Sequence, residues 1–299
     1  MKLFMRTFNL RTYHKKILTD TITPVTVYYK IRDNYPNSIL LESGDYHANQ
    51  KNFSYICFNP IASIKVENNI IEQTFPDGSS NLNDIDASIN LADEIHQFTK
   101  RFVVDNEDTF KFITNGIFGY TAYDAVRYFE DITISKKDNS VNIPDMYYAV
   151  YQNIIAINHF KNEAYIFAHC FNTENNIDEI DKLINIQNFP SYKFSTSSEI
   201  TSNLSDEEYK NHVELAKKHC ARGDVFQLVL SKSFTQEFKG DEFNVYRALR
   251  SINPSPYLFY FDYGNFKIFG SSPEAQLIVS EGKAEIHPIA GTFKRTGDD

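Results

Sequence analysis

The chain has 299 residues, of which 42% are hydrophobic and 23% are charged, and its formal net charge is −9. This length supports about two domains' worth of buried core, and an aromatic content of 15% excludes a disordered chain. The negative charge argues against non-specific binding to nucleic acid, because that affinity depends on Lys and Arg neutralising phosphates.

The composition also argues against a secreted or membrane protein. The three cysteines are widely spaced without a CxxC motif, which indicates neither a disulfide framework nor a zinc site. Charged and polar residues interrupt the first 20 residues before a signal-peptide core could form. No uncharged apolar run approaches the roughly 20 residues of a membrane helix. We therefore expect a cytoplasmic protein with no membrane contact.

The first part of the chain has the pattern of an α+β domain. Apolar or alternating runs predict strands, and apolar residues at helical spacing predict two helices. The predicted strands are 38–41, 55–58, 62–66 and 154–157, and the predicted helices are 85–102 and 177–186. A Ser/Thr-rich segment at 187–203 has no apolar periodicity and indicates a linker. We expect an N-terminal region over 1–190 and a second domain from 204 to 299.

The second domain begins with a helix whose two ends are marked. Ser205 and Glu208 form a capping-box sequence, and Gly223 marks the helix end. The run Val225–Leu230 then predicts a strand, in which Gln227 shares a face with Val225 and Val229. Gln227 therefore either faces solvent or has a hydrogen-bond partner, which a structural neighbour or a ligand could supply.

A second helix over about 241–251 ends before two prolines, Pro254 and Pro256. A strand meander follows, over 257–263, 266–269, 276–279 and 284–289. Two polar breaks in this meander could bind a ligand. One is Gly270–Glu274, where a partly desolvated Glu274 could act as a general acid, and the other is Pro288–Thr292. Both segments also have the composition of ordinary turns.

Six motifs follow one another along the chain: LLES (40–43), GIFGYTAYDAVRYFE (116–130), GDVFQLVLSKSF (223–234), NPSPYLFYFDY (253–263), GSSPE (270–274) and PIAGTFKR (288–295). Taken in this order, they resemble the motifs of the anthranilate synthase large subunit (component I), within the chorismate-utilising enzymes. The resemblance implies an α/β (α+β) fold, with two large antiparallel sheets packed as a sandwich and helices outside. It also implies a reaction that converts chorismate and ammonia to anthranilate and pyruvate, in tryptophan biosynthesis.

The resemblance assigns roles to residues of the second domain. Glu274 matches the general acid that protonates the departing hydroxyl, and Gln227 is expected near the attacked carbon. Thr292, Gly291 and Ala290 are expected to line the substrate pocket. Relatives that add water carry a lysine base where this chain has Gln227; because an amide cannot deprotonate water, ammonia is the expected nucleophile.

Two alternatives remain open at this stage. Many aminodeoxychorismate synthases (component I, folate pathway) carry a lysine where this chain has Ala290, which favours anthranilate as the product without excluding that enzyme. A non-catalytic tryptophan-binding fragment is the second alternative. Both LLES and NPSPY resemble the feedback site for tryptophan, whose expected residues are Glu42, Ser43, Asn253, Pro254, Tyr257 and Leu258. Leu258 replaces the usual methionine, a swap of similar volume.

The resemblance also implies groups that this stretch of sequence does not contain. Relatives continue beyond the position of Asp299 with the glutamates that bind Mg²⁺, so no metal ligand is expected in this chain, and its fold is expected to be incomplete at the C-terminus. The chain alone is expected to be inactive. Its expected partners are chorismate, tryptophan as feedback inhibitor, and a glutamine amidotransferase subunit that supplies ammonia.

Overall fold

The computed structural model describes residues 6–44, 52–86, 89–105, 110–134, 142–280 and 282–288. The chain forms two compact units, one made of Met1–Pro190 with Pro254–Ser271 and the other of Ser191–Asn253 with Ser272–Asp299. The segment Pro254–Ser271 thus belongs to the first unit, although it follows residues of the second unit in sequence.

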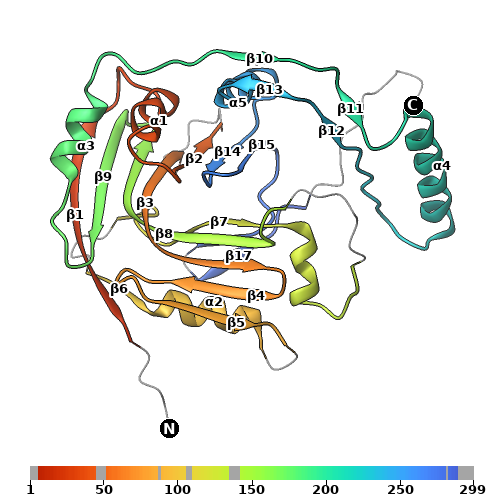
Figure 1. The fold of residues 1–299 in the computed structure, drawn as a ribbon, viewed down its shortest axis with the longest axis horizontal. Coiled ribbons are helices and arrows are strands. Elements are labelled where there is room, and N and C mark those ends of the chain that lie inside the picture. Colours follow the sequence, from red (N-terminus) through yellow and green to blue (C-terminus); the bar gives the residue numbers. More distant parts are fainter. Residues whose placement is uncertain are drawn as a thin grey trace, which may run out of the picture. The chain divides into compact units, whose positions relative to one another are not determined.

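A mixed, mostly antiparallel sheet of eleven strands organises the first unit (Figure 1). Its order is β15-β14-β2-β3-β8-β9-β1-β6, with β4, β5 and β7 branching from β3 and β8. Strands β1 and β6 run parallel. The strands are β1 (Phe8–Leu18), β2 (Ile39–Ser43), β3 (Phe53–Glu67), β4 (Ile70–Thr74), β5 (Ser80–Asp84), β6 (Phe102–Asp105), β7 (Ile117–Thr121), β8 (Met146–Asn158), β9 (Glu163–Cys170), β14 (Tyr257–Asp262) and β15 (Lys267–Ser272).

The long antiparallel strands β3 and β8 pair at the centre of this sheet. Their register runs from Phe53 opposite Asn158 to Val66 opposite Met146, with a shift between Pro60 and Ala62. Proline has no N–H to donate to a ladder, and a bulge at such a position bends the strand. One half of β3 therefore pairs with β2, and the other half pairs with β4.

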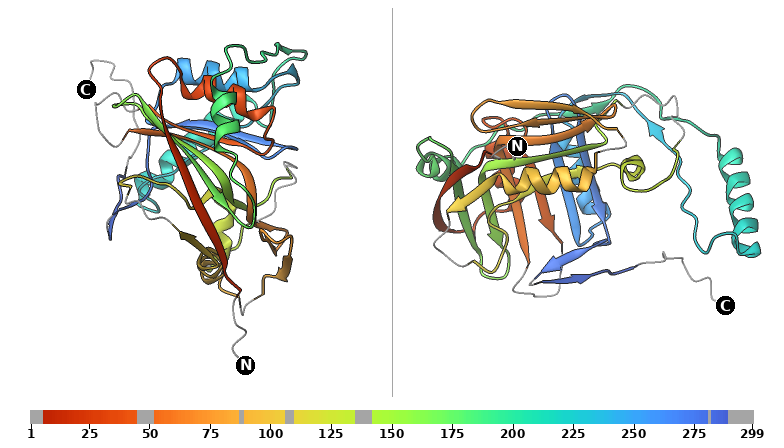
Figure 2. Two further views of the ribbon diagram at one scale, coloured as in Figure 1. Left: turned by 90° about the vertical axis from the view of Figure 1, so that its left-hand side faces the viewer. Right: turned by 90° about the horizontal axis from the view of Figure 1, so that it is seen from below.

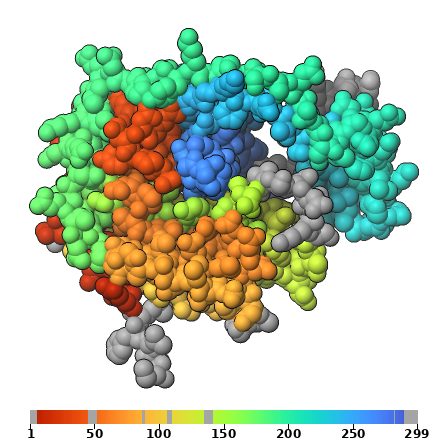
Figure 3. Space-filling view, viewed as in Figure 1, coloured from red at the N-terminus to blue at the C-terminus, as the bar shows by residue number. Residues whose placement is uncertain are grey.

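Alternation of side chains along β3 supplies two hydrophobic cores. Ile64 and Val66 pack with Phe98 of helix α2 (Leu91–Lys100) in one core. Cys57 packs with Phe261 and residues of β8 and β9 in the other. Figures 1 and 2 show α2 beside β4 and β5. The β4–β5 hairpin lies at the surface (Figure 3), and β5 is exposed along its whole length.

Two helices pack together at the other end of the sheet. Helix α1 (Pro24–Arg32) begins with Thr23 as its N-cap, and helix α3 (Ile177–Ile184) lies beside it (Figure 1). The buried Lys30 side chain of α1 donates a 2.5 Å hydrogen bond to the carbonyl oxygen of Ile184 at the C-terminal end of α3. A cation there satisfies a carbonyl that the helix itself leaves without a donor.

The second unit combines helices with short two-stranded sheets. Its helices are α4 (Asp206–Arg222) and α5 (Phe243–Ile252), and its two-stranded sheets pair β10 (Phe194–Thr196) with β13 (Phe238–Gly240), β11 (Thr201–Ser202) with β12 (Phe234–Thr235), and β16 (Ile278–Ser280) with β17 (Lys283–Glu285). The capping box is confirmed: Glu208 N–H donates to Ser205 Oγ at 3.2 Å. The helix end at Gly223 is confirmed by its left-handed φ of 79°.

Two expectations differ from the structure, whereas the fold class agrees with it. The segment 187–203 is not a plain linker, because β10 and β11 lie within it. The described residues form one large sheet and three small ones, within the α/β class expected. The strand predicted over Val225–Leu230 is wrong, because this segment has no regular secondary structure. An apolar run becomes a strand only where another strand supplies ladder partners, and none among the described residues does so here.

No helix within the described residues is long and apolar enough to cross a membrane.

Candidate functional site

The predicted catalytic residues Gln227 and Glu274 both lie in the second unit, in segments without regular secondary structure. Gln227 is exposed, four residues beyond Gly223 at the end of α4, and it does not occupy a strand face as expected. Neighbouring Phe226 is 100% exposed and Val229 is 84% exposed. The strand face on which Gln227 was expected to meet the substrate is therefore not formed by the described residues.

Glu274 occupies the predicted loop between β15 and β16. It is half-buried, and its backbone N–H donates to Ser272 Oγ at 3.2 Å. The Ser272 hydroxyl in turn donates to the Glu274 carbonyl oxygen at 3.1 Å. These reciprocal bonds define a serine turn that fixes the backbone of Glu274 close to the end of β15.

The third part of the predicted pocket, Ala290, Gly291 and Thr292, lies outside the described residues. The catalytic and substrate-binding roles of these three residues, and of Gln227 and Glu274, stay predictions.

Four of the six residues predicted to bind an amino acid are brought together in the first unit. Strand β14 pairs with β2 so that Leu258 lies opposite Glu42 and Tyr257 lies opposite Ser43. Directly opposed residues of an antiparallel pair share a face, and successive residues alternate between faces. Glu42 and Leu258 therefore share one face and are 5% and 4% exposed, whereas Ser43 and Tyr257 share the other.

The chain approaches itself closely at the end of this strand pair. Gly44 N–H donates to the Pro256 carbonyl oxygen at 3.0 Å, and a Cβ atom at Gly44 would overlap the carbonyl oxygen of Ser255. A glycine is needed for this backbone approach. Pro254 begins the segment that leads into β14. Asn253 is the C-cap of α5 in the second unit, and its N–H donates to the Leu249 carbonyl oxygen at 2.8 Å.

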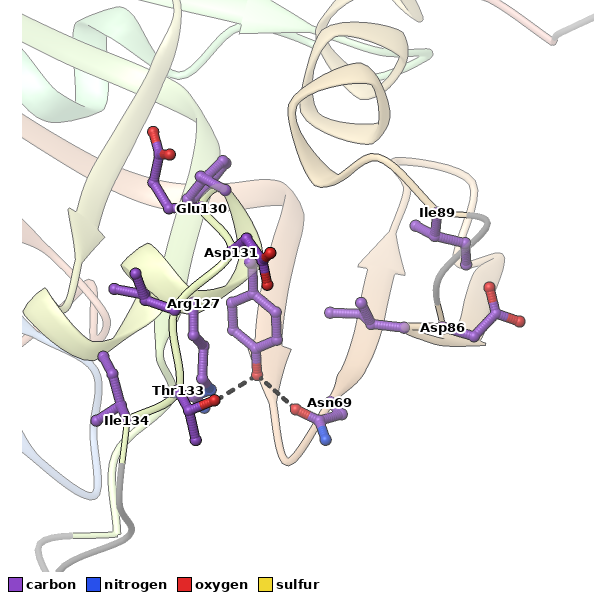
Figure 4. Close-up of a pocket in the computed structure, with 12 residues that line it drawn as sticks. Asn69, Asp86, Ile89, Arg127, Glu130, Asp131, Thr133 and Ile134 are labelled. Atoms are coloured by element: carbon purple, nitrogen blue, oxygen red, sulfur yellow. Dashed lines mark hydrogen bonds between the residues drawn. The ribbon is translucent and has the colours of Figure 1, made fainter.

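A cavity of about 700 Å³ lies in the first unit, where Arg127 and Asp131 face Asp86 and Ile89 across the opening (Figure 4). Residues 127–130 of its wall belong to the motif GIFGYTAYDAVRYFE. The sequence predicted no binding site at this motif. The periodicity of a single segment gives no sign of a cavity, because the opposite wall comes from a distant part of the chain.

A polar network holds one wall of this cavity. The Tyr128 hydroxyl lies 3.0 Å from both Asn69 Oδ1 and Asp145 Oδ2, and Arg127 donates to Asp145 Oδ2 at 2.7 Å. Burial, followed by the hydrogen bond to Asp145, raises the pKa of Tyr128. The phenol therefore stays protonated and anchors the wall as a neutral group.

The residues that the structure describes include no group of three or more His, Cys, Asp or Glu side chains able to hold a metal ion. The Mg²⁺ ion implied by the resemblance is not tested by these residues and stays a prediction.

Comparison with known proteins finds a matching family and several relatives. A family model described as chorismate binding enzyme matches residues 37–299. The anthranilate synthase component 1 of Lactococcus lactis is 32% identical over 295 residues, covering 94% of this chain and 61% of that protein. The component 1 of Aquifex aeolicus is 29% identical, covering 96% of this chain and 60% of that protein. The chain thus spans about 60% of the length of these curated relatives.

Two solved structures share the fold. Anthranilate synthase component I from Streptococcus pneumoniae matches with a TM-score of 0.61 and 25% identity, over 90% of this chain and 60% of that chain. The menaquinone-specific isochorismate synthase of Escherichia coli matches with a TM-score of 0.53 and 14% identity, over 91% of this chain and 52% of that chain. The second likeness concerns the fold alone.

Proposed function

Because the chain belongs to the family of chorismate binding enzymes, we propose that it forms part of an anthranilate synthase component I. The observation that carries this proposal is the agreement between sequence and fold. The Lactococcus lactis and Streptococcus pneumoniae proteins that it resembles in sequence and in structure, respectively, are both named anthranilate synthase component I. The proposed reaction converts chorismate and ammonia to anthranilate and pyruvate.

The proposed chemistry has two stages. Ammonia attacks C2 of the chorismate ring as the C4 hydroxyl departs, and elimination then removes the C2 proton and releases pyruvate from C3. Glu274 is proposed to protonate the departing hydroxyl, which leaves as water. The position of Glu274 in a turn fixed by Ser272 supports this role, because a general acid must be held at one place relative to the leaving group.

The neutral amide of Gln227 supports ammonia over water as the nucleophile. Ammonia attacks through its own lone pair, whereas water needs a base to remove a proton, and an amide is not a base. Ala290 leaves the pocket without a nucleophilic amine, which favours anthranilate over aminodeoxychorismate.

A bound Mg²⁺ ion would neutralise a substrate carboxylate, and a separate glutamine amidotransferase subunit would supply ammonia. The residues that this chain contributes are proposed to orient the substrate and to protonate the leaving group.

We propose further that L-tryptophan binds at the end of the β2–β14 pair. The buried Glu42 carboxylate offers a counter-charge to an ammonium group, and Leu258 beside it offers apolar surface. This arrangement fits an amino acid with an apolar side chain, such as tryptophan. Because tryptophan is made from anthranilate, its binding would provide feedback control of the proposed reaction.

Growth complementation tests the proposed activity. The whole reading frame that encodes this chain is expected to restore growth without tryptophan to a bacterium that lacks anthranilate synthase component I and is supplied with ammonium. Rescue of a strain that requires 4-aminobenzoate, without rescue of the tryptophan auxotroph, would show that the product is aminodeoxychorismate. A frame that carries Glu274→Gln, expressed at the same level, is the matched control and is expected not to support growth.

A further inference from the structure

A hydrogen-bonded Ser-His pair, made of the buried Ser54 and the partly buried His159, lies beside the strand end where tryptophan is proposed to bind. Ser54 of β3 is fully buried, and its Oγ lies 2.7 Å from Nε2 of His159, which directly follows β8. Neither residue belongs to the motifs that the sequence analysis singled out. A hydroxyl and an imidazole that are this close form a hydrogen bond that fixes both side chains.

The same Ser54 hydroxyl holds the end of strand β2. The paired residues of β2 and β3 run from Ile39 opposite Cys57 to Leu41 opposite Tyr55. Beyond that point the Ser43 N–H donates to Ser54 Oγ at 3.3 Å, so a side chain continues the ladder. On the other edge of β2, the pairing with β14 extends to Ser43 opposite Tyr257.

The register also places Ser54 on the face that carries Glu42 and Leu258. Tyr55 lies opposite Leu41, so the preceding residue of β3, Ser54, shares a face with the following residue of β2, Glu42. Leu258 lies opposite Glu42 on the same face. Three side chains that are each no more than 5% exposed thus lie in a row across β3, β2 and β14.

We propose that Ser54 and His159 are positioning residues for the amino-acid effector, an inference that rests on the proposed tryptophan site. When the Ser54 hydroxyl donates to His159 Nε2, the lone pairs of Oγ point away from that bond and receive the Ser43 N–H. The Ser43 backbone is thereby fixed, and with it the carboxylate of Glu42 one residue earlier. His159 acts through Ser54, and Ser54 acts through the backbone of Ser43.

Calorimetric titration of the 299-residue chain with L-tryptophan tests this inference. Ser54→Ala is expected to raise the Kd by roughly tenfold, because it removes the acceptor of the Ser43 N–H. His159→Phe is expected to raise the Kd in the same direction. His159→Gln, whose amide can reach the position of Nε2, is expected to restore the Kd to within about threefold of the native chain.

Ser63→Ala is the matched control. Ser63 also lies on β3, and its hydroxyl is 2.8 Å from Oγ1 of Thr74 on β4. Its removal therefore costs a hydrogen bond between side chains away from the end of β2. This variant is expected to lose stability without a change in the Kd. A role for Ser54 in stability alone would make Ser54→Ala and Ser63→Ala behave alike.

The outcomes separate this inference from the proposed function. If the native chain binds tryptophan and the Ser54→Ala and His159→Phe variants bind it with the native Kd, the positioning role is overturned while the effector site stands. If the native chain gives no binding at millimolar tryptophan, the proposed effector site itself is overturned, and the positioning role with it. A Kd that is raised equally by His159→Phe and by His159→Gln would overturn the assigned role of His159.

Discussion

The buried ring of His169 is held between two threonines, with Nε2 at 2.8 Å from the carbonyl oxygen of Thr114 and Nδ1 at 2.9 Å from Oγ1 of Thr12. A carbonyl oxygen only accepts, so the proton of the neutral ring lies on Nε2, and Nδ1 accepts from the Thr12 hydroxyl. Protonation of Nδ1 would place a positive charge on this buried ring, and the Thr12 hydroxyl would then accept the hydrogen bond. Burial lowers the pKa of His169, although the hydrogen bond to Thr114 opposes this shift.

We therefore expect stability to fall in mild acid. Because the pKa is lower in the folded chain than the value of about 6.5 in the unfolded chain, the unfolded chain binds the proton more readily. The contribution of His169 is present above the unfolded pKa and is lost as the pH falls below it. Urea unfolding at about pH 7.5 and about pH 5 measures this loss, which His169→Gln is expected to reduce. An unchanged pH dependence in that variant would contradict the assignment.

Gly44→Ala is expected to destabilise the first unit by about 1–3 kcal/mol, because the new methyl group would overlap the backbone carbonyl oxygen of Ser255. Backbone cannot rotate out of the way as a side chain can. Urea unfolding measures the change. Ser80→Ala on the exposed strand β5 is the control and should alter the free energy of unfolding by less than about 0.5 kcal/mol.

Helix α4 depends on its caps, because none of its side chains is buried. Ser205→Ala is expected to cost about 1 kcal/mol of helix stability by removing the acceptor of the Glu208 N–H. Hydrogen exchange of the amides in α4 should become faster, while exchange in the large sheet should stay unchanged. Glu207→Gln, in the same turn but outside the capping box, is the control. Equal exchange in both variants would show that packing holds the helix.

Phe226→Ala should leave the free energy of unfolding within about 0.5 kcal/mol of the native value, because Phe226 is fully exposed. Phe261→Ala on β14, where the side chain is 6% exposed, should cost about 3–5 kcal/mol. Thermal or urea unfolding of the two variants provides the comparison. A loss of several kcal/mol at Phe226 would mean that the segment 225–230 packs in solution.

Glu42→Gln should weaken tryptophan binding at least tenfold, since it removes the charge proposed to meet the ligand's ammonium group. Leu258→Met should leave the Kd within about threefold, because leucine and methionine have similar volumes. Calorimetric titration measures both values. Weaker binding in Leu258→Met than in Glu42→Gln would contradict the proposed role of the carboxylate.

Local interactions could be predicted from the sequence alone. Both ends of α4 follow from Ser205, Glu208 and Gly223, because caps use groups within one helical turn. The strand 38–41 was predicted from its apolar pattern and is confirmed as part of β2. The family was identifiable because its motifs keep their order along the chain, and the match over residues 37–299 confirms it.

Pairing between distant segments was decided only by the tertiary structure. Strand β1 was not predicted, because polar and charged residues occupy most of its exposed positions, yet β9 and β6 provide its ladders. The apolar run Val225–Leu230 finds no ladder partner in the part of the chain that the structure describes, and it forms no strand. Likewise, the sequence only placed Glu42 and Leu258 in two separate motifs. The register of β2 with β14 sets these residues opposite each other on one face of the sheet, and the register of β2 with β3 brings Ser54 beside them. A hydrogen-bonded ladder requires two strands, so one segment's own residues cannot specify it.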